Sequence, residues 1–393
     1  MLIKKIDTFV LKTPLNAKTF YSSQAAFPER NSLLVRITTD DGLVGWGEGG
    51  QYGPAEPPES CIIDVLAPRL IGRRADQPVR VFEDLYSFCR DFGQKGTYIE
   101  ALSAIDIALW DLWGKSLNRP VHALMGGAFR DKVAAYGTGC YYPDYFRDTP
   151  RMMAALAEEA QRYREAGLPA IKIKIGLLPI AQDIERVALV RDVLGPDTLI
   201  MVDANHAYNT AGAIRIGRAL ERFDVRWFEE PVPPEDRQGY RRVRDSIDVP
   251  IAGGECEYTR FGFRELLAGG CIDIAQPDLC CAGGFTEWQK ILALTTAHGV
   301  MTVPHIWGSG IALAAALQAL ATAPLVPYTA LGVPLQNEPM VEFDRTHNPL
   351  RDDLLVDNFT LVDGCLAVPG GPGLGVEVDP DQLARYTVRS RSA

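Results

Sequence analysis

The sequence lacks the short motifs that identify several common classes of enzyme. Its eight cysteines include no CxxC pair of the kind that binds zinc. It contains no HExxH segment and no Walker A loop, and the glycine-rich run at 370–375 lacks both GxGxxG spacing and a following helical pattern. These absences argue against a structural zinc site, a zincin-type protease, a P-loop enzyme and a dinucleotide-binding enzyme.

Positive charge is also scarce. The chain has 40 Lys and Arg against 50 Asp and Glu, a net charge of −10, which argues against nucleic acids and anionic membranes as partners. A small anionic substrate stays possible, because a local group of lysines and a metal can override the overall sign. The first residues lack the apolar core of a signal peptide, so a cytoplasmic protein with reduced thiols is expected.

One uncharged stretch, 306–326, is long enough to span a bilayer. It is rich in Ala and Gly, contains Gln318 and follows directly on His305. We therefore interpret it as a buried helix of a globular protein.

The order of predicted elements indicates an α/β protein with two parts. Residues 1–128 predict an α+β capping domain, and residues 129–355 predict a (β/α)7–8 TIM-like barrel, because short β-rich runs alternate there with helical patterns. The segment of about 356–393 returns to short strands and is expected to complete the capping domain. Within the first part, strands are predicted at 3–11 and 32–39 and from 43, helices at 79–92 and 98–117, and loops at 13–30 and 49–59. Barrel strands are predicted near 133–139, 170–176, 199–205, 226–231, 250–255, 273–278, 301–305 and 328–342.

Three carboxylates stand at the ends of consecutive barrel strands. Asp203, Glu229 and Glu255 are each 26 residues apart, which is the repeat length of one βα unit, and barrel chemistry lies at the carboxyl ends of the strands. Single acids at such positions often cap helices or form surface ion pairs. Three converging anions repel one another unless a cation lies among them, and oxygen ligands suit Mg²⁺.

Lysines and a His–Asp pair continue this series on both sides. Lys172 and Lys174 alternate with isoleucines, so both face the barrel interior, and two such close ammonium groups are expected to lower each other's pKa. Asp278 and His305 end the sixth and seventh strands. An Asp bonded to one imidazole nitrogen fixes the tautomer and raises the basicity of the other nitrogen.

With these residues in place, the chain resembles the enolase superfamily, and within it the mandelate racemase subgroup. The motifs are Lys172-Ile-Lys174, Asp203-Ala-Asn205, Glu229-Glu-Pro, Gly254-Glu255, Gln276-Pro-Asp278 and Pro304-His305. Longer stretches, including Val303-Pro-His-Ile-Trp-Gly and Glu342-Phe-Asp-Arg-Thr-His-Asn, resemble the D-galactarolactone cycloisomerases, and acid-sugar dehydratases share the framework. Members with a third Lys after the sixth strand are a poor match, because residues 251–289 contain no Lys.

The resemblance implies roles for individual residues. Asp203, Glu229 and Glu255 would hold Mg²⁺, with Glu229 preferred to Glu230. Lys174 would be the base on one face of the substrate, and the His305–Asp278 dyad would accept or donate a proton on the other face. Lys172 would neutralise the substrate carboxylate. Glu342, or second Glu338, would hydrogen-bond the substrate. Four residues would either line the pocket or have a structural role, in a turn for Asn205 and in packing for Trp307, Tyr141 and Tyr142. The candidates on the capping loops are Tyr21, Arg30, Gln51 and Tyr52.

The implied reaction is removal of the proton alpha to a carboxylate, giving an enediolate, followed by β-elimination. Expulsion of a lactone ring oxygen would make the chain an aldarolactone cycloisomerase, whereas expulsion of a hydroxyl would make it an aldonate or aldarate dehydratase. Return of the proton would give a 2-hydroxy acid racemase or epimerase. A non-catalytic carbohydrate-binding barrel and a metal-dependent aldolase or hydrolase are the remaining alternatives. The resemblance also implies a homo-oligomer, a tetramer or an octamer.

Overall fold

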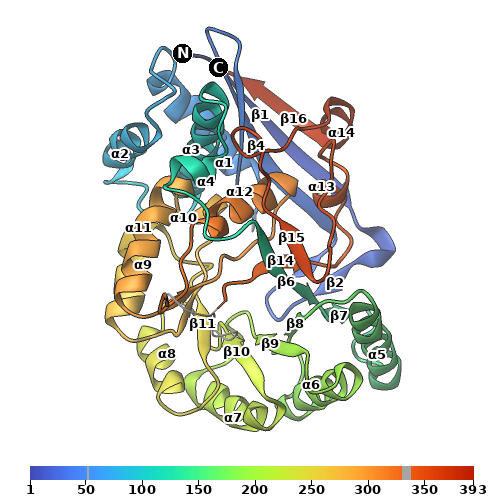
Figure 1. Ribbon diagram of the computed structural model, residues 1–393. Coiled ribbons are helices and arrows are strands. Elements are labelled where there is room, and N and C mark those ends of the chain that lie inside the picture. Colours follow the sequence, from blue (N-terminus) through green and yellow to red (C-terminus); the bar gives the residue numbers. More distant parts are fainter. Residues whose placement is uncertain (51–52, 330–337) are drawn as a thin grey trace.

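The structure is a computed structural model that describes residues 1–50, 53–329 and 338–393 (Figure 1). Two large β-sheets and a small one of three short strands organise these residues. The first sheet has the strand order β16-β1-β4-β5, and the second is a parallel sheet with the order β13-β12-β11-β10-β9-β8-β6-β14. The second sheet curls, and most of its helices lie outside it, as Figure 1 shows. This confirms the predicted α/β class with a TIM-like barrel and a separate N-terminal sheet.

The N-terminal lobe follows the predicted order of elements. Its strands are antiparallel, with β4 between β1 and β5 and a turn at Asp40–Asp41. Two long helices, α2 and α3, pack beside this sheet and contribute to its core. The bounds are β1 Ile3–Pro14, β4 Glu29–Thr39, β5 Val44–Gly49, α1 Glu56–Ser60, α2 Pro78–Cys89, α3 Thr97–Ser116 and α4 Val121–Leu124.

The barrel strands end where the sequence places its polar residues. They are β6 Lys132–Gly139, β8 Ala170–Lys174, β9 Leu199–Asp203, β10 Val225–Glu229, β11 Ile251–Gly253, β12 Ile274–Ala275, β13 Met301–Thr302 and β14 Val341–Asp344. Seven parallel ladders join these eight strands, and no ladder joins β13 to β14 among the described residues. A buried layer that includes Tyr136, Met201 and Trp227 fills the barrel interior, so the strand ends form the floor of a site and not the mouth of a channel.

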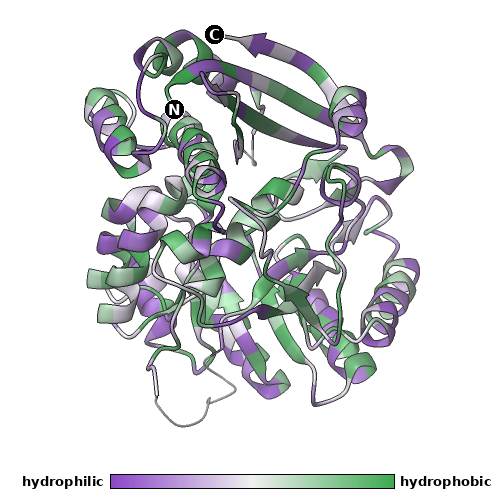
Figure 2. Ribbon diagram, turned by 45° about the horizontal axis from the view of Figure 1, so that its top comes forward, coloured by the Kyte–Doolittle hydropathy of each residue, from purple (hydrophilic) through white to green (hydrophobic). Residues whose placement is uncertain are grey.

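The helices between these strands present mixed surfaces, and hydrophobic and hydrophilic residues alternate along them (Figure 2). This alternation lets one side of each helix pack on the sheet and the other face water. The bounds are α5 Thr149–Glu165, α6 Ile180–Leu194, α7 Thr210–Leu220, α8 Arg237–Arg244, α9 Thr259–Ala268, α10 Leu279–Ala282, α11 Gly284–Ala297, α12 Gly310–Ala321, α13 Pro349–Asp352 and α14 Pro380–Tyr386.

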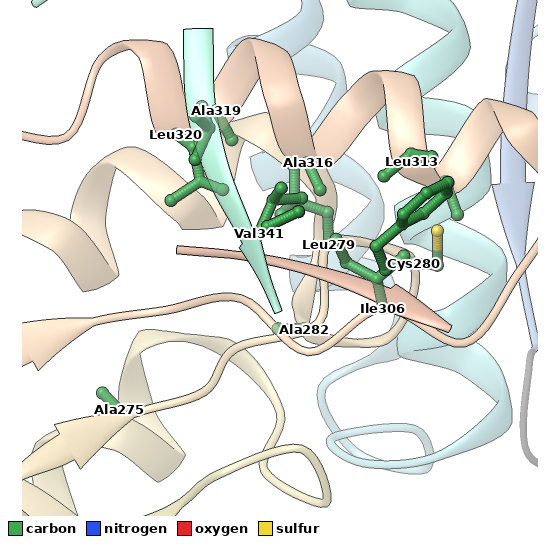
Figure 3. Packing of buried hydrophobic residues seen from close by; sticks show 14 of the residues in the cluster. Ala275, Leu279, Cys280, Ala282, Ile306, Leu313, Ala316, Ala319, Leu320 and Val341 are labelled. Atoms are coloured by element: carbon green, nitrogen blue, oxygen red, sulfur yellow. The ribbon is translucent and has the colours of Figure 1, made fainter. Parts of the chain in front are cut away.

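The uncharged stretch at 306–326 contains α12, whose residues are all buried. Ala316 and Leu320 of this helix lie close to Val341 of β14, and Leu313 lies towards Cys280 and Ile306 (Figure 3). Across the described residues, no helix combines the length and the apolar character needed to cross a membrane. The interpretation of this stretch as a buried helix is thus confirmed.

Two sequence predictions about local structure are wrong, and the expected return of the C-terminal segment to the first lobe is followed by β16 but not by β15. The segment 13–30 is not an irregular loop throughout, because β2 (Phe20–Tyr21) pairs with β3 (Ala26–Phe27) and with β7 (Tyr142–Pro143) of the barrel. The last barrel strand begins at Val341 and not at 328, although residues 330–337 lie outside the described part. The segment after 358 pairs with β6 through β15 (Cys365–Ala367), and it is β16 (Thr387–Ser392) that joins β1.

The two lobes are joined by buried polar contacts. Glu48, on β5, accepts hydrogen bonds from Ser32 Oγ (2.6 Å), Ser309 Oγ (2.6 Å) and the backbone N–H groups of Ser309 and Ala312 (both 2.9 Å). These backbone donors lie at the start of α12, where a helix leaves its N–H groups unpaired. The carboxylate therefore caps a barrel helix from the neighbouring lobe.

A second such contact gives a testable dependence on pH. Asp106 on α3 accepts hydrogen bonds from Thr286 Oγ1 (2.5 Å) and Thr286 N (3.0 Å) on α11. Burial raises the pKa of Asp106 from 3.8 to about 7, although the Thr286 donors act in the opposite direction. A carboxyl whose pKa is higher in the folded than in the unfolded state favours folding at low pH. That contribution is lost as the pH rises from about 4 to about 7.

The side chain introduced by Asp106→Asn does not titrate, and its neutral amide can accept from Thr286 N and donate to Thr286 Oγ1. We therefore expect this substitution to remove the loss of stability that Asp106 causes as the pH rises. The thermal unfolding midpoint of the variant relative to the wild type should therefore rise between pH 5 and pH 8. Asp197→Asn, at an exposed Asp, serves as the control and should show no such difference. An Asp106→Asn protein whose relative midpoint falls with rising pH would contradict a protonated Asp106.

Candidate active site

The three acids predicted as metal ligands lie together at one end of the barrel. Asp203 ends β9 and is in register with Glu229, which ends β10, while Glu255 follows β11 by two residues. All three are buried, and one carboxylate oxygen of each lies within 4.8 Å of the others. Glu229, and not its neighbour Glu230, belongs to this group.

The electrostatics of the three acids suit a divalent cation. Burial raises the pKa of Glu229, with Asp203 and other carboxylates adding to the effect against Lys172. Burial also raises the pKa of Asp203, but Lys174 and Lys172 outweigh it and lower that pKa. Oε2 of Glu255 is buried without a hydrogen-bond partner among the described residues. Three close, buried oxygen donors are a fitting ligand set for Mg²⁺.

Lys172 and Lys174 of β8 are both buried, but they have different neighbours. Lys174 donates a hydrogen bond to Asp203, whereas Lys172 Nζ lies 2.6 Å from Glu229 Oε1 and 2.8 Å from Glu342 Oε1. Lys172 is thus engaged by protein carboxylates, and its role towards a substrate carboxylate stays a prediction.

Without a bound cation, the pKa values of both lysines are raised, so the expected lowering is wrong for the metal-free protein. Burial does lower the pKa of Lys174, but the Asp203 carboxylate outweighs it, and the pKa is raised. The pKa of Lys172 is raised as well, by Glu229 and Glu342 against burial. The carboxylates on the next strands raise the pKa of each lysine by more than the repulsion between the two ammonium groups lowers it.

The structure brings His305 and Asp278 together across two strand ends. His305 Nδ1 lies 2.8 Å from Asp278 Oδ2, and His305 Nε2 lies 3.5 Å from Glu255 Oε2. The other Asp278 oxygen accepts from Cys280 N at the start of α10 (2.7 Å). Burial lowers the pKa of His305, but Glu255, Glu342 and Asp278 outweigh it and raise the pKa to about 9.

Glu342 of β14 points into the buried interior beside Lys172. It accepts hydrogen bonds from Thr138 and from Ile306 N (3.2 Å), and Lys172 and His305 lower its pKa against burial. Glu338, the second candidate, is exposed.

A cavity of about 270 Å³ opens above these groups. Lys174, Glu255 and His305 lie at its floor. The candidates Asn205, Tyr141 and Trp307 line it, together with Ser22, Gln24, Ala25, Phe27, His206 and Cys256. Tyr142, in contrast, donates to the buried Asp183.

Of the capping-loop candidates, Tyr21 is in β2, and Gln51 and Tyr52 lie outside the described residues. Arg30 is paired with Asp344 (2.7 Å) and lies over the Trp307 ring, 4.2 Å from its centroid. Asn205 was predicted either to close a turn or to line the pocket, and its position allows both. Its backbone N–H donates to Asp203 Oδ1 (2.8 Å), and the residue lines the cavity.

Sequence reasoning missed several residues of the site. Gln276 Nε2 and Trp227 Nε1 donate to Glu229 Oε2 at 2.7 and 3.0 Å and orient that carboxylate. Gln276 stands within the quoted Gln276-Pro-Asp278 motif, so its position on a strand end was a usable signal. Ser22, Gln24 and Phe27 carry no such signal, because a hairpin far away in the sequence brings them to the cavity.

Fold and site together define an α/β-barrel enzyme with acid–base groups beside a candidate metal centre. Residues 5–126 match the family of mandelate racemase / muconate lactonizing enzyme N-terminal domains, and residues 155–382 match the enolase C-terminal domain-like family. The chain therefore belongs to the enolase superfamily, in its mandelate racemase subgroup. This membership removes the alternative of a non-catalytic barrel.

Similar proteins cover the whole chain. A D-galactarolactone cycloisomerase of Agrobacterium fabrum is 42% identical over 98% of this chain and 99% of its own. The crystal structure of a 3,6-anhydro-D-galactonate cycloisomerase from Zobellia galactanivorans is 41% identical, with a TM-score of 0.87 over 99% of this chain and 100% of its own. A racemase structure from Streptomyces coelicolor with bound magnesium is 30% identical, with a TM-score of 0.86 over 98% of this chain and 100% of its own.

Proposed function

We propose that this enzyme is a Mg²⁺-dependent cycloisomerase of a sugar-acid lactone or a similar cyclic sugar acid, of the D-galactarolactone type. The observation that carries the proposal is that ionisable and aromatic side chains line different sides of the cavity. Its floor holds the ionisable groups, and one wall consists of the aromatic rings of Phe27, Tyr141 and Trp307.

The distribution of charge favours a substrate with one carboxylate and an uncharged ring. Among the described lining residues, Lys174 is the only Lys or Arg, and it lies at the floor. The residues outside the description, 51–52 and 330–337, contain no Lys or Arg in the sequence. An open-chain dicarboxylate would place its second charge against neutral side chains, which desolvates that charge without pairing it. A sugar ring instead offers an apolar face to aromatic side chains.

The chain's own residues can carry the proton transfers. His305 and Lys174 both line the cavity, and Asp278 at 2.8 Å orients the imidazole, so we assign removal of the alpha proton to His305 Nε2 and assign Lys174 as the group that donates a proton. The C–H electron pair forms a C=C bond as the bond from the beta carbon to the ring oxygen breaks. A lactone ring oxygen leaves as a carboxylate, and the donated proton goes to the beta carbon when the enol becomes a ketone, whereas the ring oxygen of an anhydro sugar takes up the donated proton itself. The resulting enol gives an open-chain 2-keto acid.

Asp203, Glu229 and Glu255 would hold Mg²⁺, which when bound supplies Lewis-acid stabilisation of the negative charge on the substrate carboxylate oxygens. Gln276 and Trp227 keep Glu229 oriented. Asp278 holds the tautomer of His305 in which Nδ1 carries the proton.

The test is a comparison of substrates with excess Mg²⁺. Aldarolactones and anhydro-sugar acids, each with one carboxylate, are compared with the open-chain aldonates and aldarates of the same configuration, and keto-acid formation is measured. We expect kcat/KM for a cyclic acid to exceed that for every open-chain aldarate by about 10²-fold or more, as for a charge left unpaired in a neutral site. A better open-chain substrate would make the enzyme a dehydratase. Alpha-proton exchange in D₂O without keto acid would make it a racemase or epimerase.

Two further features are proposals. The capping domain is taken as residues 1–128 with about 356–393, and the catalytic barrel as 129–355. The two separate sheets support this division except at β15, which pairs with β6 of the barrel sheet. A homo-oligomer, a tetramer or an octamer, is expected from the family, and size-exclusion chromatography with light scattering measures it.

A further inference from the structure

A second group of metal-ligating side chains stands beside the three acids. His206, Glu230 and Cys256 each offer one ligand atom, and these atoms all lie within 4.8 Å of one another. Nε2 of His206 is 3.5 Å from Oε2 of Glu230. The three residues follow β9, β10 and β11, one to three positions beyond Asp203, Glu229 and Glu255. The same strand ends therefore present two different ligand sets.

The contacts of Glu230 leave its carboxylate without a structural explanation. The side chain is 1% exposed, and Oε2 has no hydrogen-bond partner among the described residues. Its only ion-pair neighbour in that part of the chain is His206. The Cys256 thiol donates a hydrogen bond to this carboxylate, but a buried carboxylate oxygen without a donor is costly to the fold, and the proposed reaction gives Glu230 no task. A cation between the three side chains would supply the missing partner.

The chemistry of the donors selects the kind of cation. Imidazole nitrogen, thiolate sulfur and carboxylate oxygen together suit Zn²⁺, which takes tetrahedral sites of this mixed type, whereas Mg²⁺ prefers oxygen alone. We propose that His206, Glu230 and Cys256 form a second metal site that binds Zn²⁺ or a similar transition-metal ion, separate from the magnesium site.

The position of these residues also defines the open side of the site. His206 and Cys256 line the substrate cavity, while Glu230 lies behind them, away from it. Three protein ligands leave the fourth tetrahedral position free. Because His206 and Cys256 line the cavity, a water molecule or an exogenous ligand could reach that position from the cavity.

Co²⁺ is the probe, because a tetrahedral Co²⁺–thiolate centre absorbs in the near ultraviolet. The full-length protein is freed of metals, saturated with Mg²⁺ and titrated with Co²⁺ under reducing conditions. We expect one Co²⁺ per chain to develop thiolate-to-cobalt absorption. Cys256→Ser should abolish the absorption, and His206→Ala should weaken Co²⁺ binding by about 100-fold through loss of one of three ligands.

Two control variants make the result decisive. Cys365→Ser changes another half-buried cysteine, on β15, and should leave the titration unchanged. Asp203→Asn impairs the magnesium site and should keep the Co²⁺ absorption. The proposal is overturned if the wild type develops no thiolate absorption, if the absorption survives in Cys256→Ser, or if it disappears in Asp203→Asn. Thermal stabilisation of Cys256→Ser by Mg²⁺ shows that this variant is folded.

Discussion

His305→Asn is expected to reduce kcat by roughly 10³-fold, within the range that removal of a general acid–base group gives. The substitution removes Nε2, the atom that we assign to the alpha proton. Asn can still donate to Asp278 and replaces a buried ring by a smaller polar group, so the barrel should stay folded. The measurements are kcat on the best cyclic acid and the rate of alpha-proton exchange in D₂O.

The matched control is His298→Asn, because His298 is an exposed histidine at the end of α11. We expect it to leave both rates unchanged. If His305→Asn loses keto-acid formation but keeps wild-type exchange, Lys174 removes the proton and our assignment of the two roles is reversed. Retention of more than about a tenth of kcat, well outside the range for a lost acid–base group, would exclude His305 as an essential group.

Asp203→Asn is expected to abolish both turnover and stabilisation by magnesium. This carboxylate belongs to the acid group and also accepts from Lys174, so its replacement removes a charged metal ligand and the partner of an acid–base group together. In the wild type, Mg²⁺ should raise the thermal unfolding midpoint, because a ligand that binds the folded state alone stabilises it. In Asp203→Asn, the same Mg²⁺ concentration should leave the midpoint where EDTA does, and kcat should fall by at least ~10³-fold.

Asp248→Asn changes an exposed Asp and should keep both responses. Two results would contradict the magnesium assignment. One is full turnover of the wild type after exhaustive chelation. The other is an equal rise of the unfolding midpoint with Mg²⁺ in the wild type and in Asp203→Asn.

Much of the site can be read from the sequence because the barrel converts spacing along the chain into proximity. Asp203 and Glu229 are 26 residues apart and become register partners on adjacent strands. His305 and Asp278 meet for the same reason. In each case a short apolar strand fixes the local structure, and the parallel sheet fixes the neighbour.

The remainder depends on contacts that no local pattern encodes. The two-residue strands β2 and β3 exist because Phe20 and Phe27 pack on Tyr141, more than a hundred residues away. The lysine pKa values depend on how many carboxylates surround each ammonium group, which is a three-dimensional quantity. The metal-ligand character of Glu230 likewise becomes visible only when His206 and Cys256 are placed around it.

The hairpin of β2 and β3 has a consequence for how such enzymes diversify. The hairpin contributes Phe27, and its turn contributes Ser22, Gln24 and Ala25, to one side of the cavity. The ionisable residues of the cavity floor follow the barrel strands. Exchange or lengthening of this one surface element would reshape what the enzyme accepts and leave its proton-transfer groups untouched. The hairpin side of the cavity and the proposed proton-transfer residues thus lie on separate stretches of the sequence, so the first can change while the second is kept.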